Sequence, residues 1–371
     1  MKTPICLSPC SGGNAEDPSA DDPYIDFTKA SYDFEVTQIL DKIEQIQTQK
    51  NQTGDFSPIL VGLQFPEGLK KHAVELSFLI ENITGASVLI SADPCFGACD
   101  LDAALISKTD VMFHFGHAQL EHTDLEKKVC FIETRSKVDV NPAILSALAL
   151  LPEKKIGLVT TVQHVHQLEN VKSILEDAGK TVVIARGDSR TPYPGQVLGC
   201  NFSAARPSKG DCDVYLFIGS GRFHPIGVAL SSKKRVVCAD PFFSEAFELD
   251  FRKFLMQRSA VIGNSMDAET FGIIVSTKNG QCREKLAQRL KEKANAHGKQ
   301  AVILRMDLVT PDQMLNFPVG AFVNTACPRL AIDDSGRYPV PVLTPQEFEI
   351  VLGERDWEDL ILDEILEGER E

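Results

Sequence analysis

Short apolar, β-branched runs alternate with amphipathic segments along most of the chain, and this order of segments occurs three times. In each repeat a strand-like run comes first, a segment with apolar positions at helical spacing follows, and a second strand-like run comes next. Fully apolar runs of this kind are typical of parallel strands that helices cover on both faces. The pattern therefore predicts an α/β fold made of three related units.

The three units share the same order of predicted elements. The opening strands are expected at residues 59–64, 155–161 and 271–277, the helices at 69–80, 165–175 and 284–296, and the second strands at 87–91, 181–185 and 301–305. Third strands are expected from Asp110, Asp213 and Val319, and the first two units show a fourth, from Lys128 and Arg235. An amphipathic helix over 34–49 precedes the first unit, and an acidic, helical segment from Glu347 ends the third.

The length of 371 residues exceeds what one ordinary hydrophobic core supports. We expect three related parallel-sheet α/β domains arranged around a pseudo-threefold centre, with boundaries at 33–150, 151–258 and 259–371. Residues 1–32 are rich in Pro, Ser, Gly and Asp, which is typical of a flexible tail.

The chain carries 38 basic and 52 acidic side chains, a formal net charge of −14. Proteins that hold nucleic acid electrostatically need a basic surface, so no nucleic-acid partner is expected. No apolar run reaches the ~18 residues of a membrane span, and the polar, acidic N-terminus does not resemble a signal peptide. We therefore expect a cytoplasmic protein, without a membrane partner, whose cysteines are reduced thiols.

Six of the ten cysteines have an ordinary interpretation as small apolar or solvent-exposed residues. They are Cys130, Cys212 and Cys238 in or beside buried-strand runs, Cys282 at the start of a charged helix, and Cys6 and Cys10 in the tail. The other four lie in loops beyond predicted strands, among Gly, Ala and Pro: Cys95 and Cys99 in SADPCFGACDLD, Cys200 in YPGQVLGCNFS, and Cys327 in NTACPRLAIDD.

These loops belong to equivalent places in the three units. Ligands of parallel sheets bind at the carboxyl ends of the strands, and small neighbours let the backbone approach a bulky ligand. Cys99, Cys200 and Cys327 are too far apart in sequence for a local metal motif, but one thiolate per unit could meet at the centre. Three thiolates and one open position suit a 4Fe–4S cluster, whereas a structural zinc site normally has four ligands. Coincidence, and Cys95 in place of Cys99, remain alternatives.

Other polar residues near strand ends are candidates for binding a cofactor. Gly219, Gly221, Arg222 and His224 form a glycine-rich turn after a strand, which could hold a carboxylate or a nucleoside or could be a tight strand–helix connection. Gln64, Glu67 and Gly68 follow the first strand, and residues 276–281 are their equivalent in the third unit. Asp240 in ADPF and Asp333 after Cys327 could orient a ligand or cap a helix.

Histidines raise the question of a further metal site. His114, His117 and His122 form an HxxHxxxxH run. We do not expect this run to bind metal, because His114 falls within a buried strand and the three side chains should face different directions. His164 and His166 are interpreted as a loop feature, with substrate positioning as the alternative.

Six motifs occur in an order that resembles a known enzyme family. They are LQFPEGL (63–69), PCFGACD (94–100), PGQVLGC (194–200), GSGRFHPIG (219–227), ADPF (239–242) and ACPRLAIDD (326–334). Over residues 55–348 the chain is similar to the archaeal 2-(3-amino-3-carboxypropyl)histidine synthases, which perform the first step of diphthamide biosynthesis.

The resemblance implies three α/β domains that each donate one cysteine to a 4Fe–4S cluster, here Cys99, Cys200 and Cys327. Cys99 is preferred to Cys95 because the family pattern has Gly-Ala-Cys before an acidic residue. It also implies that the open iron engages S-adenosylmethionine (SAM), and that a radical derived from SAM transfers its aminocarboxypropyl group to C2 of a histidine in translation elongation factor 2. Methylthioadenosine is the by-product. An electron donor and a homodimer are further expectations.

Two other functions remain open from the sequence. Quinolinate synthase shares the triplicated fold and one cysteine per domain, but the order of the motifs favours the first family. A non-enzymatic iron–sulfur or metal-binding protein is the third possibility, although electron carriers usually use protein ligands at all four cluster irons.

Overall fold

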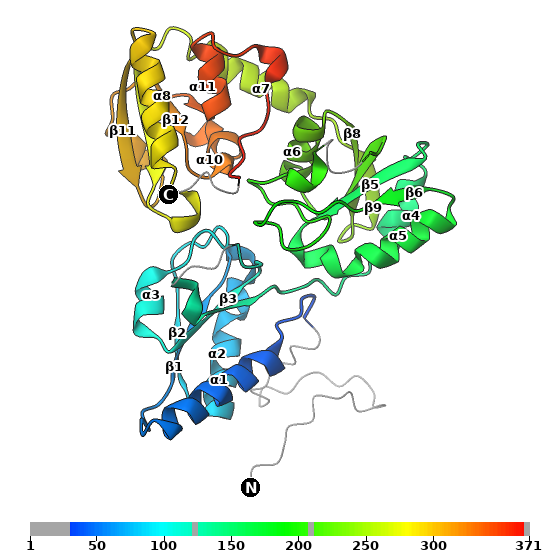
Figure 1. Ribbon diagram of the computed structural model, residues 1–371, viewed down its shortest axis with the longest axis vertical. Helices are drawn as coiled ribbons and strands as arrows, with labels where there is room; N and C mark the ends of the chain where they lie inside the picture. Colours follow the sequence, from blue (N-terminus) through cyan, green and yellow to red (C-terminus); the bar gives the residue numbers. More distant parts are fainter. Residues whose placement is uncertain (1–29, 121–124, 207–210, 367–371) are drawn as a thin grey trace, which may run out of the picture.

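Three separate sheets form the framework of the computed structural model, which describes residues 30–120, 125–206 and 211–366. Their strand orders are β2-β1-β3-β4, β6-β5-β7-β8-β9 and β11-β10-β12-β13, so each opening strand lies between the second and third strands of its unit. Every strand pair is parallel except β8 with β9. The predicted α/β class with parallel sheets is thus confirmed. Figure 1 shows the three units around a common centre.

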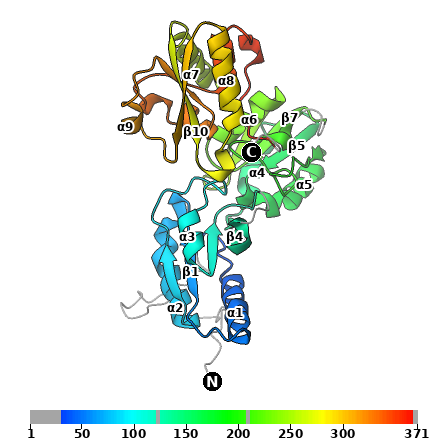
Figure 2. The ribbon, with the colours of Figure 1, turned by 60° about the vertical axis from the view of Figure 1, so that its left-hand side comes forward.

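In the described residues, the first unit, which follows α1 (Val36–Gln52), contains four strands and four helical segments. Its elements are β1 (Leu60–Gln64), η2 (Glu67–His72), α2 (Ala73–Thr84), β2 (Ser87–Ile90), α3 (Ala103–Lys108), β3 (Val111–Phe115), η3 (Leu125–Lys128) and β4 (Val129–Ile132). The predicted helix over 34–49 is confirmed in α1, whose Ile39 and Ile43 pack into the core of this unit. Figure 2 shows α1 and α2 beside this sheet.

The second and third units repeat this order. The second comprises α4 (Asn141–Leu148), β5 (Lys155–Thr160), η4 (Val162–Gln167), α5 (Leu168–Asp177), β6 (Thr181–Val183), η5 (Ser203–Ala205), β7 (Val214–Ile218), α6 (Phe223–Ser232), β8 (Arg235–Asp240) and β9 (Glu245–Glu248). The third comprises α7 (Arg252–Gly263), β10 (Thr270–Ser276), η7 (Asn279–Gln281), α8 (Glu284–Ala296), β11 (Gln300–Met306), α9 (Pro311–Met314), β12 (Ala321–Asn324), α10 (Pro328–Ile332), η8 (Ser335–Arg337), β13 (Val342–Leu343), α11 (Pro345–Val351) and η9 (Trp357–Asp359).

Each opening strand is nearly or wholly buried and leads into a short 3₁₀ segment before the long helix. Continuous burial explains why β1, β5 and β10 read as unbroken apolar runs rather than alternating ones. The shared strand–3₁₀–helix path delivers the loop after each opening strand to the same side of its sheet.

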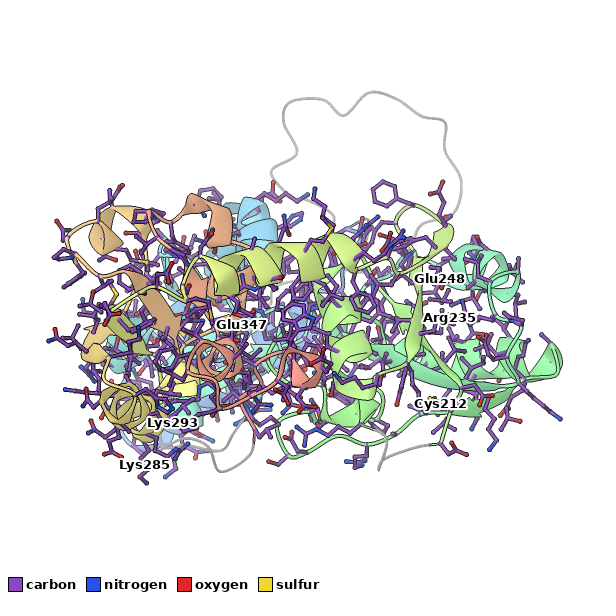
Figure 3. The ribbon with its side chains drawn as sticks, turned by 90° about the horizontal axis from the view of Figure 1, so that it is seen from above. Cys212, Arg235, Glu248, Lys285, Lys293 and Glu347 are labelled. Atoms are coloured by element: carbon purple, nitrogen blue, oxygen red, sulfur yellow. The ribbon has the colours of Figure 1, made fainter. Side chains whose placement is uncertain are left out.

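Two features of the third unit were not predicted. The strand β13 has only two residues and pairs with β12, so it is too short to show a period in sequence. The helix α7 lies across the predicted 258/259 boundary and packs on α11, where Arg258 and Glu347 form a buried ion pair with a nitrogen–oxygen distance of 2.5 Å. Figure 3 shows Glu347 and Lys293 in this unit, on the opposite side from Cys212, Arg235 and Glu248 of the second.

The acidic end of the chain is only partly helical. After η9, residues 360–366 run without regular structure along the second unit. We call these residues the C-terminal strap. Leu362 joins the core of the second unit, and the Ile365 amide donates to the Cys200 carbonyl at 2.7 Å. The strap thus connects the third unit to the loop that carries Cys200. The domain boundaries remain predictions, as does the tail, of which residues 1–29 lie outside the described residues.

Within the described ranges, no helix combines the length and the apolar character needed to cross a bilayer.

Candidate functional site

The three cysteines predicted as ligands come from three different units and approach one another at the centre. All three are half-buried. Cys99 lies in the loop after β2, Cys200 in the loop after β6, and Cys327 directly before α10. They are close enough that charge on Cys99 and Cys200 raises the pKa of the Cys327 thiol, and charge on Cys99 raises that of Cys200.

Cys99 is held by contacts from both the first and the third unit. The Gln64 side-chain amide donates to the Asp100 carbonyl at 2.8 Å, and Lys278 of the third unit donates to the Asp100 carboxylate at 2.6 Å. The Gln281 amide nitrogen lies 3.2 Å from the Cys99 sulfur. A side-chain carbon at Gly280 would lie 2.1 Å from the Cβ of Cys99. A glycine at this position therefore allows the loop before α8 to lie against Cys99.

Cys200 and Cys327 are fixed mainly through their backbones. The turn around Cys200 is closed by hydrogen bonds between Leu198 and Asn201, and the C-terminal strap binds the Cys200 carbonyl. Cys327 is the residue before α10, and the Asn324 side chain donates to its carbonyl at 2.8 Å. Both thiols therefore extend from turns whose backbones are hydrogen-bonded within the protein.

Two buried arginines lie close to these thiols. Arg190 donates to the Ile365 carbonyl at 2.7 Å and to the Gly280 carbonyl at 3.4 Å, while its Nε has no hydrogen-bond partner among the described residues. Arg283 forms a buried ion pair with Asp363 of the strap, with a nitrogen–oxygen distance of 2.5 Å. Arg190 joins the second unit, the third unit and the strap around the centre.

Burial controls the protonation of the thiols when no metal is bound. It raises the pKa of Cys200 to about 12, which Arg190 partly opposes, and it also raises the pKa of Cys99 and Cys327. A thiolate at this centre therefore needs a compensating positive charge, which a metal supplies. Three soft sulfur donors beside a buried guanidinium with a free N–H suit an anionic iron–sulfur cluster.

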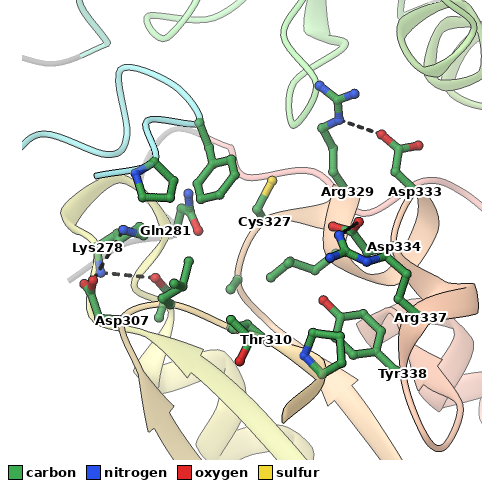
Figure 4. Close-up of a pocket in the computed structure, with 18 of the residues that line it drawn as sticks. Lys278, Gln281, Asp307, Thr310, Cys327, Arg329, Asp333, Asp334, Arg337 and Tyr338 are labelled. Atoms are coloured by element: carbon green, nitrogen blue, oxygen red, sulfur yellow. Dashed lines mark hydrogen bonds and ion pairs between the residues drawn. The ribbon is translucent and has the colours of Figure 1, made fainter. Parts of the chain in front are cut away.

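A pocket of about 770 Å³ opens beside Cys327. Figure 4 shows its wall, which α10, the turn after it and the loops after β10 and β11 provide. The charged and aromatic side chains around it are Lys278, Asp307, Asp312, Arg329, Asp333, Asp334, Arg337, Tyr338 and Phe96. Arg329 pairs with Asp333 at 2.7 Å, so Asp333 contributes to this pocket. The pocket thus combines both signs of charge with aromatic and apolar surface.

Of the candidates for binding a cofactor, Asp333 and part of the range 276–281 line this pocket, whereas the other eight residues do not. Gln64 is buried and supports the Cys99 loop, Glu67 is exposed and pairs with Lys70 at 2.6 Å, and Gly68 faces open space. Asp240 accepts hydrogen bonds from the Ser220 hydroxyl at 2.7 Å and from the Phe242 amide at 3.0 Å. The assignment of a binding role to these residues remains a prediction.

The glycine-rich turn after β7 has the strand–helix geometry that its sequence indicates. Gly219 and Gly221 have φ values of 141° and 81°, which favour glycine. Arg222 is exposed and lies over the Phe247 ring, whereas His224 stacks on Phe217. Burial, and then Arg329, lower the pKa of His224 to about 4. Arg329 is thus close enough to act on His224 of this turn, and it also lines the pocket beside Cys327.

Several residues at the centre were not singled out from the sequence. Lys278, Gly280 and Gln281 fall within residues 276–281, which the repeat marked only as a range. Arg329 stands in the ACPRL motif, so its position beside a ligand cysteine was a usable signal. Nothing in the sequence signalled the role of Arg190, because an arginine in a polar loop is normally exposed.

The prediction that the histidines would not converge is wrong for two of them. His114 Nε2 lies 2.9 Å from His117 Nδ1, and both lie near Cys95. The separation between these two side chains was overestimated because His117 follows the end of β3, where strand alternation no longer applies. His122 lies outside the described residues. His164 is buried, and its Nδ1 has no partner among the described residues.

Comparison with known proteins identifies the family. The family model of diphthamide synthesis proteins matches residues 65–361. The chain is 41% identical over 315 residues to 2-(3-amino-3-carboxypropyl)histidine synthase of Pyrococcus horikoshii, covering 83% of this chain and 90% of that protein. It is 27% identical over 339 residues to subunit 1 of the human synthase, covering 89% of this chain and 74% of the human one.

A solved structure gives the same result. The crystal structure of Dph2 from P. horikoshii with a 4Fe–4S cluster superposes with a TM-score of 0.81 at 37% identity, covering 91% of this chain and 96% of that chain. Sequence and fold agree over nearly the whole length, and the chain therefore belongs to the diphthamide synthesis protein family.

Proposed function

We propose that this protein is a transferase that moves the 3-amino-3-carboxypropyl group of SAM to C2 of a histidine imidazole in translation elongation factor 2, the first step of diphthamide biosynthesis. The observation that carries the proposal is the approach of Cys99, Cys200 and Cys327, one from each unit. Relatives that align over most of the chain have this activity in their names.

In this proposal the three cysteines hold a 4Fe–4S cluster, as the P. horikoshii relative does. When bound, the cluster supplies one electron, and its iron without a cysteine ligand is open to SAM. The bond from the SAM sulfur to the aminocarboxypropyl carbon breaks, and methylthioadenosine leaves. A carbon–carbon bond forms at imidazole C2, and the hydrogen there is lost as a proton while the electron returns. The net reaction thus consumes no electron.

The chain's own residues supply charge and position. The Nε–H of Arg190 is available for a sulfur of the cluster, and its positive charge offsets part of the negative charge that three thiolates bring. Gln281 lies 3.2 Å from the Cys99 sulfur and would donate a second hydrogen bond there. Such donors stabilise the reduced state of a cluster.

The pocket beside Cys327 is the place proposed for SAM. Arg329 and Arg337 carry guanidinium groups suited to the methionine carboxylate, and Asp333 and Asp334 are suited to its ammonium group. Tyr338 and Phe96 offer rings for the adenine base. Because Cys327 itself lines the pocket, SAM bound there would lie next to the cluster.

The remaining parts of the proposal concern partners. We infer a cytoplasmic enzyme that works as a homodimer and receives electrons from a separate donor, as the resemblance to the archaeal synthases implies. The net charge of −14 supports a protein substrate rather than nucleic acid.

The decisive experiment is an anaerobic assay with the reconstituted protein, SAM, dithionite and archaeal elongation factor 2. Methylthioadenosine and a histidine peptide heavier by one aminocarboxypropyl group are expected, by chromatography and mass spectrometry. The matched control is elongation factor 2 in which the target histidine is replaced by glutamine. An intact cluster with neither product would contradict the proposal.

A further inference from the structure

A second group of metal-ligand side chains lies in the first unit, apart from the three-cysteine centre. The group consists of Cys95 in the loop after β2, His114 on β3 and His117 just beyond β3. One ligand atom from each lies within 4.8 Å of the other two. Cys95 and His114 are buried, with 2% and 0% of their surface exposed, and His117 is half-buried.

The hydrogen bonds around His114 orient it for metal binding. Gln64 Nε2 donates to the Asp100 carbonyl, which fixes the amide so that its oxygen faces His114 Nδ1 at 2.9 Å. An amide oxygen can only accept, so Nδ1 carries the proton and Nε2 keeps its lone pair. A histidine that donates one ring N–H to an oxygen while the other nitrogen points at a metal is the usual arrangement of a metal ligand.

Burial keeps these side chains neutral and without charged partners. It lowers the pKa of His117 to about 4 and the pKa of His114 well below its ordinary value. Among the described residues, no lysine, arginine or carboxylate is hydrogen-bonded to the Cys95 sulfur, which lies 4.0 Å from the Gly97 carbonyl oxygen. The imidazoles are therefore already neutral when a metal binds, whereas the Cys95 thiol must lose its proton to become a thiolate.

From this geometry we propose that Cys95, His114 and His117 bind one zinc ion, with the fourth position open to water or another small ligand. Tetrahedral zinc has ligand atoms about 3.3–3.6 Å apart at bond lengths of about 2.0–2.3 Å. The two histidine nitrogens, at 2.9 Å, would therefore move slightly apart, and any wider pair within the 4.8 Å limit would draw together. Zinc would replace the 2.9 Å hydrogen bond between the two histidines. One sulfur and two imidazoles match the ligand preference of zinc.

The site would connect two parts of the first unit that otherwise meet through Gln64. Cys95 and Cys99 share one loop, while His114 and His117 belong to the end of β3. Zinc would tie that loop to the sheet four residues before the cluster ligand. The site does not depend on the transferase proposal, because its three ligands all come from the first unit.

Zinc K-edge X-ray absorption on the full-length, cluster-loaded protein tests the site, since this edge does not detect iron. One zinc per chain is expected by elemental analysis, with one sulfur at about 2.3 Å and two or three nitrogen or oxygen neighbours at about 2.0–2.1 Å. Three sulfur neighbours would place zinc in the three-cysteine centre instead and would overturn the proposal, as would a protein that retains no zinc after growth with added zinc.

Variants separate ligation from folding. Cys95→Ala and His117→Ala should each lower zinc affinity by about 100-fold or more, and Gln64→Ala by about 10–100-fold. The matched control is His164→Gln, at another buried histidine, which should leave zinc binding unchanged. All four variants are checked for unchanged circular dichroism and iron content. Unaltered zinc affinity in folded Cys95→Ala and His117→Ala would also overturn the proposal.

Discussion

Cys95 and Cys99 belong to one loop, yet they occupy sites of opposite construction. Cys95 is buried beside two histidines of its own unit. Cys99 contacts Gly280 and Gln281 of the third unit, and the charge of Arg190 in the second unit acts to lower its pKa. One site is complete within a single sheet and its loops. The other exists only when three units and the C-terminal strap are assembled. The site to which each cysteine of this loop contributes therefore depends on which units surround its thiol.

Single alanine substitutions of the two cysteines should remove different metals. Cys99→Ala should abolish binding of four irons and all transfer activity while zinc is retained, because the other two thiols cannot hold the cluster alone. Cys95→Ala should retain the four irons and lose zinc. Iron and zinc are measured together by elemental analysis. Full iron content in Cys99→Ala together with cluster loss in Cys95→Ala would show that Cys95, and not Cys99, is the cluster ligand.

The dependence of the centre on assembly is tested at the strap. Asp363→Ala removes the carboxylate that pairs with the buried Arg283 guanidinium and should destabilise the chain by about 3–5 kcal/mol in urea unfolding. Glu347→Ala removes the partner of Arg258, a similarly buried pair within the third unit, and should cost about as much. Only Asp363→Ala should also lower iron content. Equal iron loss in both variants would mean that stability, not the strap, governs cluster binding.

Electrostatic influence on the two sites should differ as well. Arg190→Met removes a positive charge near Cys99 and Cys200, so the cluster should become harder to reduce. With an effective dielectric constant of ~20 and a separation on the order of 5–8 Å, which a hydrogen bond to a cluster sulfur implies, the change is about 2–3 kcal/mol, or roughly 90–140 mV. Redox titration followed by electron paramagnetic resonance measures the potential.

Arg190→Lys keeps the charge and is the matched control for this change. It should shift the potential less than Arg190→Met does, and neither variant should alter zinc affinity. A potential that is the same in both variants and in the unaltered protein would show that Arg190 only supports the backbone of Ile365 and Gly280.

The last effect concerns the stability of the chain at low pH and the buried side chain of His164. Burial lowers the pKa of His164 from 6.5 to about 4, so between these values the unfolded chain binds a proton that the folded chain does not. Stability is therefore lost as the pH falls from 6.5 to 4. His164→Gln should remove up to roughly 3 kcal/mol of this acid sensitivity, measured by urea unfolding at pH 7.5 and pH 4.5. Identical pH dependence in both proteins would contradict the assignment.

The repeating fold was predictable because its signal is continuous. The buried strands β1, β5 and β10 are unbroken apolar runs, and α8 begins and ends where its pattern indicates, at Glu284 and Ala296. The strand β13 could not be predicted, since two residues show no period. The course of residues 360–366 was equally hidden, because contacts with the second unit, rather than local propensity, determine it.

The candidate site was predictable to the same degree as the repeat. One cysteine in a strand-end loop of each unit indicated Cys99, Cys200 and Cys327. The expectation that these loops are equivalent is wrong, because Cys99 and Cys200 follow the second strand of their units and Cys327 follows the third. Nothing local marked Arg190 as a buried residue. The pocket beside Cys327 is built by α10, the loop after β11 and Phe96 of the first unit, and only the folded chain brings these together. The sequence marked His114 and His117, but metal binding was not expected because their side chains were taken to face different directions, and Cys95 was considered only in place of Cys99.

The central claim is that one cysteine from each of the three units leaves one iron of a 4Fe–4S cluster open to SAM. The most direct test is the Mössbauer spectrum of protein reconstituted anaerobically with ⁵⁷Fe, recorded before and after SAM is added. If one iron is open to SAM, the signal of one iron in four shifts on addition of SAM while the signals of the other three stay as they were. A spectrum that SAM leaves unchanged at saturating concentration, in a protein that transfers the aminocarboxypropyl group, would contradict it.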